Sequence, residues 1–317
     1  MMNEKINILA DKIRDAKSIV IMGHKNPDGD ALGAVLAMGR LIELNFGVLP
    51  VCVYDGNIPD TLDNFPLRQT VRYVGRLDPA KTFDLALVLD YGTVRNLGAS
   101  ADVAQKAAYR IEIDHHENDA PIGDLCINDV HAAATTQIIY EIMTTAGWKY
   151  DADVCNLVAL GLMTDTGMFK YISDSRPLRI MADLVDGGIH VRRLADGLNN
   201  RPAKSVQAEA TVVARAEFLY GGRLALATVM SREYKNLDGR GDMILGMLGQ
   251  IKGVEYIAVL KQQRENQTGV SLRGRTRPVR QIATALGGGG HEYAAGAVIA
   301  DRIDRARAQI IEMFEGE

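Results

Sequence analysis

The sequence predicts an α/β protein: an N-terminal doubly wound, mainly parallel sheet, joined by a helical linker to a smaller α+β domain with a mixed sheet. Three observations support this prediction. Apolar, β-branched runs alternate with helical periodicity over the first half of the chain, as in parallel strands covered by helices on both faces. Helical periodicity then continues from about 175 to 216, and strand-like runs return afterwards. At 317 residues, the chain has the length of two domains.

The individual elements follow from these patterns. In the first half, the expected strands are "SIVIMG", "VLPVCVY", "DLALVLD", "YRIEID" and "DLCIND", and the expected helices cover 31–45, 133–146 and 152–163. In the second half, the expected strands are "GGRLALATVM", "EYIAVLKQQ", "TGVSLRGR" and "AAGAVIA", and the expected helices cover 241–251, 279–286 and 302–315. The predicted domain limits are 1–190 for the parallel-sheet domain, 191–218 for the helical linker and 219–317 for the mixed-sheet domain.

Composition restricts the class of protein. The net charge of −4 argues against a protein that binds nucleic acid over its whole surface. We do not expect binding of long duplex DNA, which would require a broader basic surface. The three cysteines are far apart and form no C-x-x-C pair, which is typical of reduced thiols in a reducing compartment. The charged, amphipathic N-terminus does not resemble a signal peptide, and no apolar run is long enough to span a membrane. We therefore expect a cytoplasmic protein with no membrane partner.

Acids and imidazoles gather where apolar runs end. "HKNPDGDALG" places His24, Asp28 and Asp30 between a strand and a helix, at the sheet edge where α/β proteins bind ligands. Taken alone, this stretch has a simpler interpretation: Asp30 caps the helix and Asp28 makes an Asx turn.

Three further segments repeat the pattern: "DLALVLDYG" ends a strand with Asp90, "YRIEIDHHEND" ends one with Asp114, His115 and His116, and "VALGLMTDTGMF" ends a helix with Asp165. Charges at the ends of apolar runs are costly unless they are paired or bind a metal. Four such sites in one domain predict a metal centre. His131 and His190 do not lie in such a constellation, and we expect them to be ordinary histidines.

The types of ligand narrow the choice of ion. Carboxylates with a few imidazoles and no thiolate suit Mn²⁺ or Mg²⁺, with Zn²⁺ and Co²⁺ as alternatives, and the histidines favour Mn²⁺. The candidates suffice for two ions about 3.5–4 Å apart that share a carboxylate, as in phosphoesterase sites.

A glycine run in the second half, "LGGGGH", indicates a binding loop. Gly288, Gly289 and Gly290 allow close backbone approach and expose amides to a phosphate or a base edge, followed by His291. The alternative is a helix end, which requires one glycine rather than four. In "SLRGR", the alternating Arg273 and Arg275 are candidates for clamping a terminal phosphate.

Together these motifs resemble the DHH phosphoesterase family: "HKNPDGDALG", "LDYG", "DHH" and "LMTDTG" follow in family order, and "GGGGHEYAAGA" is similar to the glycine-rich signature of the associated DHHA1 domain. Length and layout are most similar to the NrnA-type branch. The resemblance assigns six side chains to two divalent ions: His24 and Asp28 to the first, Asp30, His115 and Asp165 to the second, and Asp90 to both. It further implies that Asp114 orients an imidazole, and that His116 faces the scissile phosphate as a hydrogen-bond or proton donor.

The resemblance implies a two-metal phosphoesterase that acts on short oligoribonucleotides (nanoRNA), linear dinucleotides such as pApA, or 3′-phosphoadenosine 5′-phosphate (pAp). An inorganic pyrophosphatase is an alternative that the glycine-rich domain disfavours. A non-catalytic nucleotide sensor is another, disfavoured because no motif position is lost. Two departures concern the substrate: Asp119 stands where the family commonly has Asn, with Asn118 one step earlier, and the arginine-bearing loop is shorter. The oligomeric state is left open, with a homodimer as one option.

Overall fold

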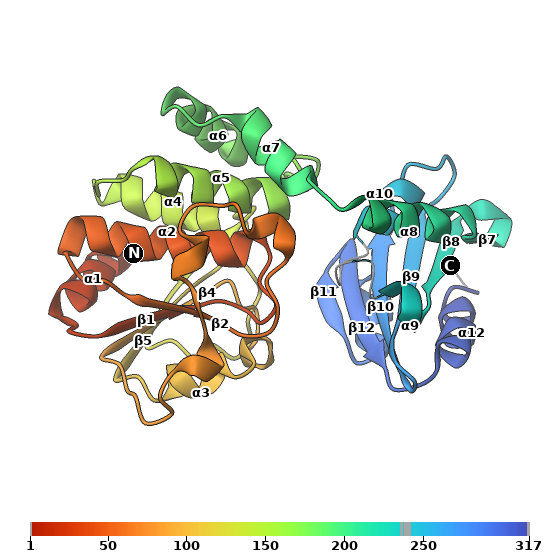
Figure 1. The fold of residues 1–317 in the computed structure, drawn as a ribbon, viewed down its shortest axis with the longest axis horizontal. Coiled ribbons are helices and arrows are strands. Elements are labelled where there is room, and N and C mark those ends of the chain that lie inside the picture. Colours follow the sequence, from red (N-terminus) through yellow and green to blue (C-terminus); the bar gives the residue numbers. More distant parts are fainter. Residues whose placement is uncertain (1, 235–236, 238–241, 316–317) are drawn as a thin grey trace. The chain divides into compact units, whose positions relative to one another are not determined.

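The structure, a computed structural model, describes residues 2–234, 237 and 242–315 (Figure 1). The chain divides into two compact units, Met1–Asn200 and Arg201–Glu317. Each unit has its own sheet and its own hydrophobic clusters. The α/β class with a parallel N-terminal sheet and a mixed C-terminal sheet is confirmed.

The first unit is built on a six-stranded sheet in the order β3-β2-β1-β4-β5-β6. All its strand pairs are parallel. The strands are β1 (Ile19–Met22), β2 (Val51–Tyr54), β3 (Arg72–Tyr73), β4 (Leu85–Leu89), β5 (Tyr109–Asp114) and β6 (Leu125–Asn128). In this order the chain proceeds in one direction from β1 to β3 and in the other from β4 to β6. The strand order therefore reverses between β1 and β4, which is where open α/β sheets bind ligands.

Helices cover both faces of this sheet (Figure 1). The helices are α1 (Met2–Asp15), α2 (Gly29–Phe46), α3 (Ser100–Gln105), α4 (Thr135–Thr145), α5 (Ala152–Asp165), α6 (Arg176–Asp186) and α7 (Val191–Asn199). Alternate strand residues point to opposite faces: Ile19 and Ile21 join the cluster under α1, α2, α4 and α5, whereas Val20 and Met22 join the cluster under α3. Burial on both faces explains the continuous apolar runs.

Helices α2 and α5 approach each other closely because glycines line their contact. A Cβ atom at Gly33 would lie 2.6 Å from the carbonyl oxygen of Leu157, and one at Gly29 would lie 2.5 Å from the Thr164 side chain. The close approach brings the first turn of α2 next to the last turn of α5. The acidic residues of those two turns are thereby drawn into one site.

The second unit contains a mixed sheet in the order β11-β12-β10-β9-β8-β7, in which only β8 and β9 pair in parallel. Its strands are β7 (Glu217–Leu219), β8 (Leu224–Val229), β9 (Tyr256–Arg264), β10 (Gln267–Gly274), β11 (Gly289–His291) and β12 (Ala294–Ile299). Its helices are α8 (Ala203–Ala214), α9 (Ser231–Tyr234), α10 (Asp242–Leu248), α11 (Arg280–Ala285) and α12 (Ile303–Met313). Helices α8 and α10 pack on one face of the sheet and α11 and α12 on the other.

The segment predicted as a linker contains helices of both units. Leu194 of α7 joins the core of the first unit, and Val212 of α8 joins a core cluster of the second. The sequence-based limits at 190 and 218 stay a prediction. The predicted helix over 241–251 begins at a residue outside the described part of the chain, and α10 ends at Leu248. Among the described residues, no helix is both long and apolar enough to cross a membrane.

Candidate metal centre

The candidate site lies at the carboxyl ends of the strands, at the point where the strand order reverses. His24 follows β1 by two residues, and Asp90 directly follows β4, the neighbouring strand. The backbone N–H of His24 donates to the carbonyl oxygen of Asp90 at 3.3 Å, which ties the two loops together. The next strand, β5, ends with Asp114 and leads into His115 and His116. Three adjacent strands thus deliver the predicted acids and imidazoles to one edge.

The first group of potential ligands consists of His24, Asp28 and Asp90, whose ligand atoms lie within 4.8 Å of one another. Nε2 of His24 lies 3.6 Å from Oδ1 of Asp28 and 3.8 Å from Oδ2 of Asp90. Asp28 is also the N-cap of α2, because its Oδ1 accepts the backbone N–H groups of Asp30 and Ala31. The simpler interpretation of this stretch was right about the Asx turn on Asp28 and wrong about the cap: Asp28 caps the helix as well, and Asp30 lies inside the first turn.

The second group consists of Asp30, His115 and Asp165, again within 4.8 Å. Nε2 of His115 lies 3.1 Å from Oδ2 of Asp165 and 3.6 Å from Oδ1 of Asp90. Asp30 and Asp90 are almost wholly buried, with exposed fractions of 0% and 2%. Such buried acids require hydrogen bonds, protons or cations to stabilise them.

Two of the imidazoles are arranged alike. Nδ1 of His24 lies 2.9 Å from the carbonyl oxygen of Lys25, and Nδ1 of His115 lies 3.2 Å from that of Ala132. A carbonyl oxygen accepts the Nδ1 proton, which leaves Nε2 of each ring directed at the carboxylates. This is the tautomer that binds metals through Nε2, held in place by a second hydrogen bond.

Asp114 differs from the other acids. Its Oδ2 accepts the backbone N–H groups of Tyr91 and Gly92, and its Oδ1 accepts that of His116. The same Oδ1 lies 2.8 Å from Nδ1 of His116. Although burial opposes ionisation, the hydrogen bonds from His116 and the backbone lower the pKa of Asp114. Asp114 is therefore a buried anion that fixes the orientation of the His116 ring.

A hydrogen-bond chain fixes the loop after His116. Asn118 donates to the hydroxyl of Tyr91 at 2.7 Å, and that hydroxyl donates to the buried Glu112 at 2.6 Å. Oδ1 of Asn118 also accepts the backbone N–H of Ala120, which closes an Asx turn. The turn therefore forms on Asn118, and the neighbouring Asp119 is exposed.

Residues missed from the sequence support one acid of each group, Asp90 of the first and Asp30 of the second. The backbone N–H groups of Thr135 and Thr136, at the start of α4, donate to Asp30 at 2.6 and 3.0 Å. The Thr136 hydroxyl donates to Asp30 at 2.7 Å, and the Thr135 hydroxyl donates to Asp90 at 3.1 Å. A Cβ atom at Gly161 would lie 2.3 Å from Oδ1 of Asp30, so only glycine leaves room for that carboxylate. The paired threonines at a predicted helix start were the one available signal.

Crowding of acids makes the site attractive to cations. Burial and the neighbouring charge of Asp30 raise the pKa of Asp90 to about 7, and they hold the pKa of Asp165 well above its ordinary range. Burial opposes the charged form of His24, but its hydrogen bond with Asp28 and the nearby carboxylates raise its pKa to about 10. The site thus retains protons to balance its anions, and divalent cations would meet the same demand. The donor set, carboxylates with two imidazoles, fits such ions.

The other predicted contacts belong to the second unit. The glycine run has two structural parts. Gly287, with a φ of 74°, follows the end of α11, and Gly289–His291 forms the edge strand β11. A Cβ atom at Gly288 would lie 2.1 Å from the carbonyl oxygen of Gly296. The close backbone approach is therefore to β12, and the expected loop is largely a strand.

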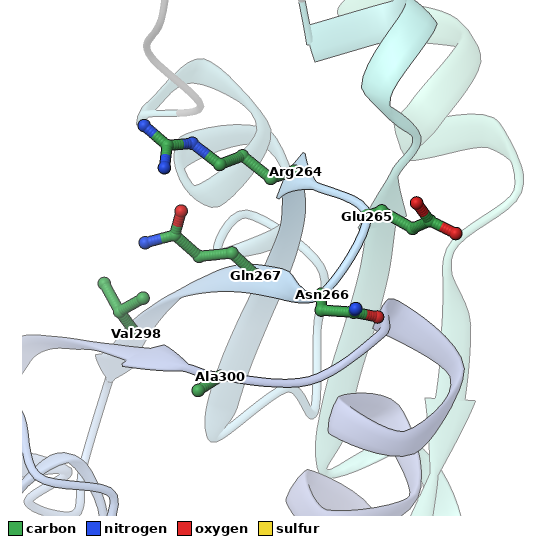
Figure 2. Close-up of a pocket in the computed structure, with 6 residues that line it drawn as sticks. All are labelled: Arg264, Glu265, Asn266, Gln267, Val298 and Ala300. Atoms are coloured by element: carbon green, nitrogen blue, oxygen red, sulfur yellow. The ribbon is translucent and has the colours of Figure 1, made fainter.

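The two arginines differ in what they contact. Arg275 donates to the carbonyl oxygens of Ile251 and Val254 at 3.2 and 3.3 Å, and Arg273 donates to that of Leu272 at 3.1 Å. A separate open hollow, at the turn between β9 and β10, is lined by Arg264, Gln267 and Val298 among others (Figure 2). It contains none of the predicted site residues.

Comparison with known proteins agrees with this geometry. Residues 18–162 match the DHH family, N-terminal domain, and residues 221–316 match the DHHA1 domain. These matches identify the protein as a phosphoesterase, a hydrolase of a metal-dependent family. The chain belongs to the DHH/DHHA1 phosphoesterases.

Individual relatives resemble the chain over most of its length. A protein of Thermus thermophilus named bifunctional oligoribonuclease and PAP phosphatase NrnA is 29% identical, over 99% of this chain and 94% of the relative. A Bacillus subtilis protein of the same name is 22% identical, over 92% and 93%. The cyclic-di-AMP phosphodiesterase GdpP of Geobacillus thermodenitrificans is 25% identical, over 97% of this chain and 49% of that protein. The solved structure of an exopolyphosphatase-related protein from Bacteroides fragilis shares the fold, with a TM-score of 0.90 at 20% identity, over 99% and 96%.

Proposed function

We propose that this phosphoesterase hydrolyses short oligoribonucleotides, linear dinucleotides such as pApA, and pAp, and that it uses two divalent ions, with Mn²⁺ preferred. The observation that carries the proposal is the position of Asp90, which forms one group of potential ligands with His24 and Asp28 and another with His115 and His116. Its carboxylate oxygens lie 3.8 Å from Nε2 of His24 and 3.6 Å from Nε2 of His115. The full-length relatives named as oligoribonucleases and PAP phosphatases support the substrate class.

The proposed ligands follow the two groups. His24 and Asp28 would hold one ion, Asp30, His115 and Asp165 the other, and Asp90 both. Two such ions, when bound, lower the pKa of a coordinated water and neutralise the charge that develops on a phosphoryl group. The protein's own contribution is to keep the carboxylates in place: Thr135 and Thr136 hold Asp30 and Asp90 through the hydrogen bonds described above.

His116 is the proposed proton donor to the leaving oxygen. Its Nδ1 is engaged by Asp114, so a proton would be donated from Nε2. Burial opposes its charged form, but the hydrogen bond with Asp114 and the charge of Asp90 raise the pKa of His116. A raised pKa favours the protonated form of the ring, which is the form that a general acid requires.

The second unit is proposed to anchor the substrate. Gly289, Gly290 and His291 form an exposed edge strand that the half-buried Gly288 precedes. Arg273 provides a positive charge on β10, two strands away in the same sheet. Arg275 is also proposed to contact the substrate. In the structure its guanidinium donates hydrogen bonds to backbone carbonyl groups of the turn after α10. Contacts remote from the reacting phosphate position the substrate and raise its rate of hydrolysis.

The test is a comparison of substrates. Purified protein with Mn²⁺ is assayed against pAp, pApA, a longer oligoribonucleotide and pyrophosphate, with each reaction repeated in excess chelator. We expect hydrolysis of pAp and pApA, and we expect both reactions to require the metal. Hydrolysis of pyrophosphate alone would support the pyrophosphatase alternative, and tight nucleotide binding without turnover of any substrate would support the sensor.

We further propose a cytoplasmic location. Cys52, Cys126 and Cys155 are free thiols, and burial raises the pKa of Cys52 to about 12, which makes that thiol unreactive. Free, unreactive thiols are typical of a reducing compartment.

A further inference from the structure

The loop that follows Asp165 has an unusual backbone. Gly167, Met168 and Phe169 all have positive φ angles, of 56°, 59° and 63°. Two of these residues are not glycine, and each non-glycine residue in this region carries strain. Strain of this kind persists only where surrounding contacts impose it, and it concentrates at functional sites.

Thr166 imposes this conformation. Its buried hydroxyl donates to the carbonyl oxygen of Leu162 at 2.5 Å and accepts the backbone N–H of Phe169 at 2.9 Å. Its carbonyl oxygen accepts the N–H of Tyr171 at 2.9 Å. Thr166 is the neighbour of Asp165, so these hydrogen bonds hold the loop at the same corner of the unit as the proposed metal ligands.

The loop turns one side chain inward and leaves its neighbours exposed. Phe169 packs against the core of the first unit, whereas Met168 and Tyr171 are 42% and 64% exposed. The Tyr171 ring rests on Gly167, where an added Cβ atom would lie 2.9 Å from the ring. A strained backbone therefore presents an aromatic ring to solvent instead of burying it.

The charge near the ring indicates what it binds. Nζ of Lys170 lies 5.0 Å from the centroid of the Tyr171 ring. An exposed aromatic ring beside a cation suits a nucleotide, because the base stacks on the ring and its phosphate is attracted to the ammonium group.

We infer that Tyr171 is a stacking platform for one nucleobase of the substrate, with Lys170 attracting the attached phosphate. The inference rests on the proposed function for its choice of substrate. It adds a base-binding subsite in the first unit, next to Asp165, to the substrate contacts proposed for the second unit.

The first test combines a substitution with changes in the substrate. Hydrolysis of pApA is compared with that of two analogues, each lacking one adenine, in the wild type and in Tyr171→Ala. Stacking of one base is equivalent to about 5- to 100-fold in affinity. Removal of the stacked adenine from the substrate and Tyr171→Ala should each raise KM by this factor. When the two changes are combined, KM should rise no further than with either change alone. Tyr171→Phe should restore the wild-type KM because phenylalanine also stacks.

Tyr150 provides the matched control. It is an exposed tyrosine just before the N-terminal end of α5, whereas Tyr171 follows the C-terminal end, and a helix of 14 residues separates its ends by about 20 Å. Tyr150→Ala should leave all three substrates unaffected. Equal losses on every substrate in Tyr171→Ala, or no loss on any, would overturn the inference.

A second test needs no turnover. The fluorescence of 2-aminopurine riboside 5′-monophosphate is titrated with each variant in the presence of Mg²⁺. Quenching is expected with the wild type, Tyr171→Phe and Tyr150→Ala, and should be lost with Tyr171→Ala. If this pattern appears but no nucleotide is hydrolysed, the proposed function fails and the base subsite stands. Quenching that is absent, or that does not depend on Tyr171, would refute the subsite whatever the site hydrolyses.

Discussion

The two carboxylate oxygens of Asp90 face different imidazoles: Oδ2 lies 3.8 Å from Nε2 of His24, whereas Oδ1 lies 3.6 Å from Nε2 of His115 and 3.4 Å from Nδ1 of His116. Asp90 holds this position with a φ of 49°, which aspartate tolerates better than most residues. A carboxylate so placed joins the two groups of ligands, and it is the natural bridge between two ions.

Replacement of this bridge should abolish catalysis without unfolding the protein. Asp90→Asn keeps the shape and the backbone preference of the residue but removes its charge. We expect hydrolysis of every substrate to fall below detection and the bound Mn²⁺ to drop from two equivalents. The melting temperature in chelator should not fall, because the change removes repulsion among buried acids. Asp102→Asn, at an exposed acid of α3, is the control. Near-wild-type turnover in Asp90→Asn would refute the two-metal assignment.

The hydroxyl of Thr135 should matter for metal affinity. Thr135→Val removes the hydrogen bond to Asp90 but keeps the backbone N–H that donates to Asp30. Loss of such a supporting contact typically weakens metal binding by about 10- to 100-fold, measurable by titration calorimetry with Mn²⁺. Thr144→Val, in the last turn of the same helix, removes a hydroxyl that bonds only to the helix backbone. Equal affinities in the two variants would contradict the role of Thr135.

Gly161 should tolerate no side chain. In Gly161→Ala, the new methyl group would meet Oδ1 of Asp30 and Oγ1 of Thr136 at 2.3 and 2.2 Å. Overpacking of this kind costs about 1–3 kcal/mol, and relief would require Asp30 to move. We expect a lower melting temperature together with loss of one Mn²⁺ equivalent. Gly246→Ala, on α10, meets no atom within 4 Å and should leave metal binding intact.

The stability of the metal-free protein should decrease as pH rises. Asp90 titrates near 3.8 when unfolded and near 7 when folded, so its proton stabilises the folded state less and less from pH 4 to 7. Folding raises the pKa of His24 from 6.5 to about 10. The contribution of its proton to stability is therefore complete below pH 6.5 and is lost as the pH approaches 10. The lowered pKa of Asp114 acts below pH 4 and leaves this trend unchanged.

Metal should reverse this trend because it competes with protons for the same ligands. We expect the rise in melting temperature caused by Mn²⁺ to grow from pH 5.5 to pH 8.5. In Asp90→Asn, the decline of the metal-free melting temperature between pH 5 and 7 should flatten. A metal-free protein that becomes more stable over this pH range would contradict the assignment.

The sequence predicted which acids and imidazoles lie together, because the pattern that marks them is local. Acids and imidazoles at the ends of apolar runs are visible without a structure, and the parallel sheet brings strand ends together. Thr135, Thr136 and Gly161 act on Asp30 across more than 100 residues. No local pattern distinguishes them from ordinary helix residues, so their role required the fold.

Local ambiguity explains the remaining differences. The choice between Asp28 and Asp30 as helix cap depended on whether Gly29 lies within α2, and α2 begins at Gly29. The strand β3 has two exposed residues and no apolar signal. Glycines have no side chains that could alternate between apolar and polar, so no strand signal appears in the sequence for the segment that pairs with β12.

The last prediction separates the roles of the two units. His291→Ala should impair hydrolysis of dinucleotides and pAp far more than that of bis(p-nitrophenyl) phosphate. The proposed metal ligands all belong to the first unit, and a small diester has no second phosphate to anchor. A charged hydrogen bond contributes about 1.5–3 kcal/mol, so kcat/KM for nucleotides should fall about ten- to a hundredfold. His190→Ala, at an exposed histidine of the first unit, should affect neither class of substrate. Equal losses on both classes would place His291 in the chemical step, and no loss on either would leave the glycine run a purely structural edge strand.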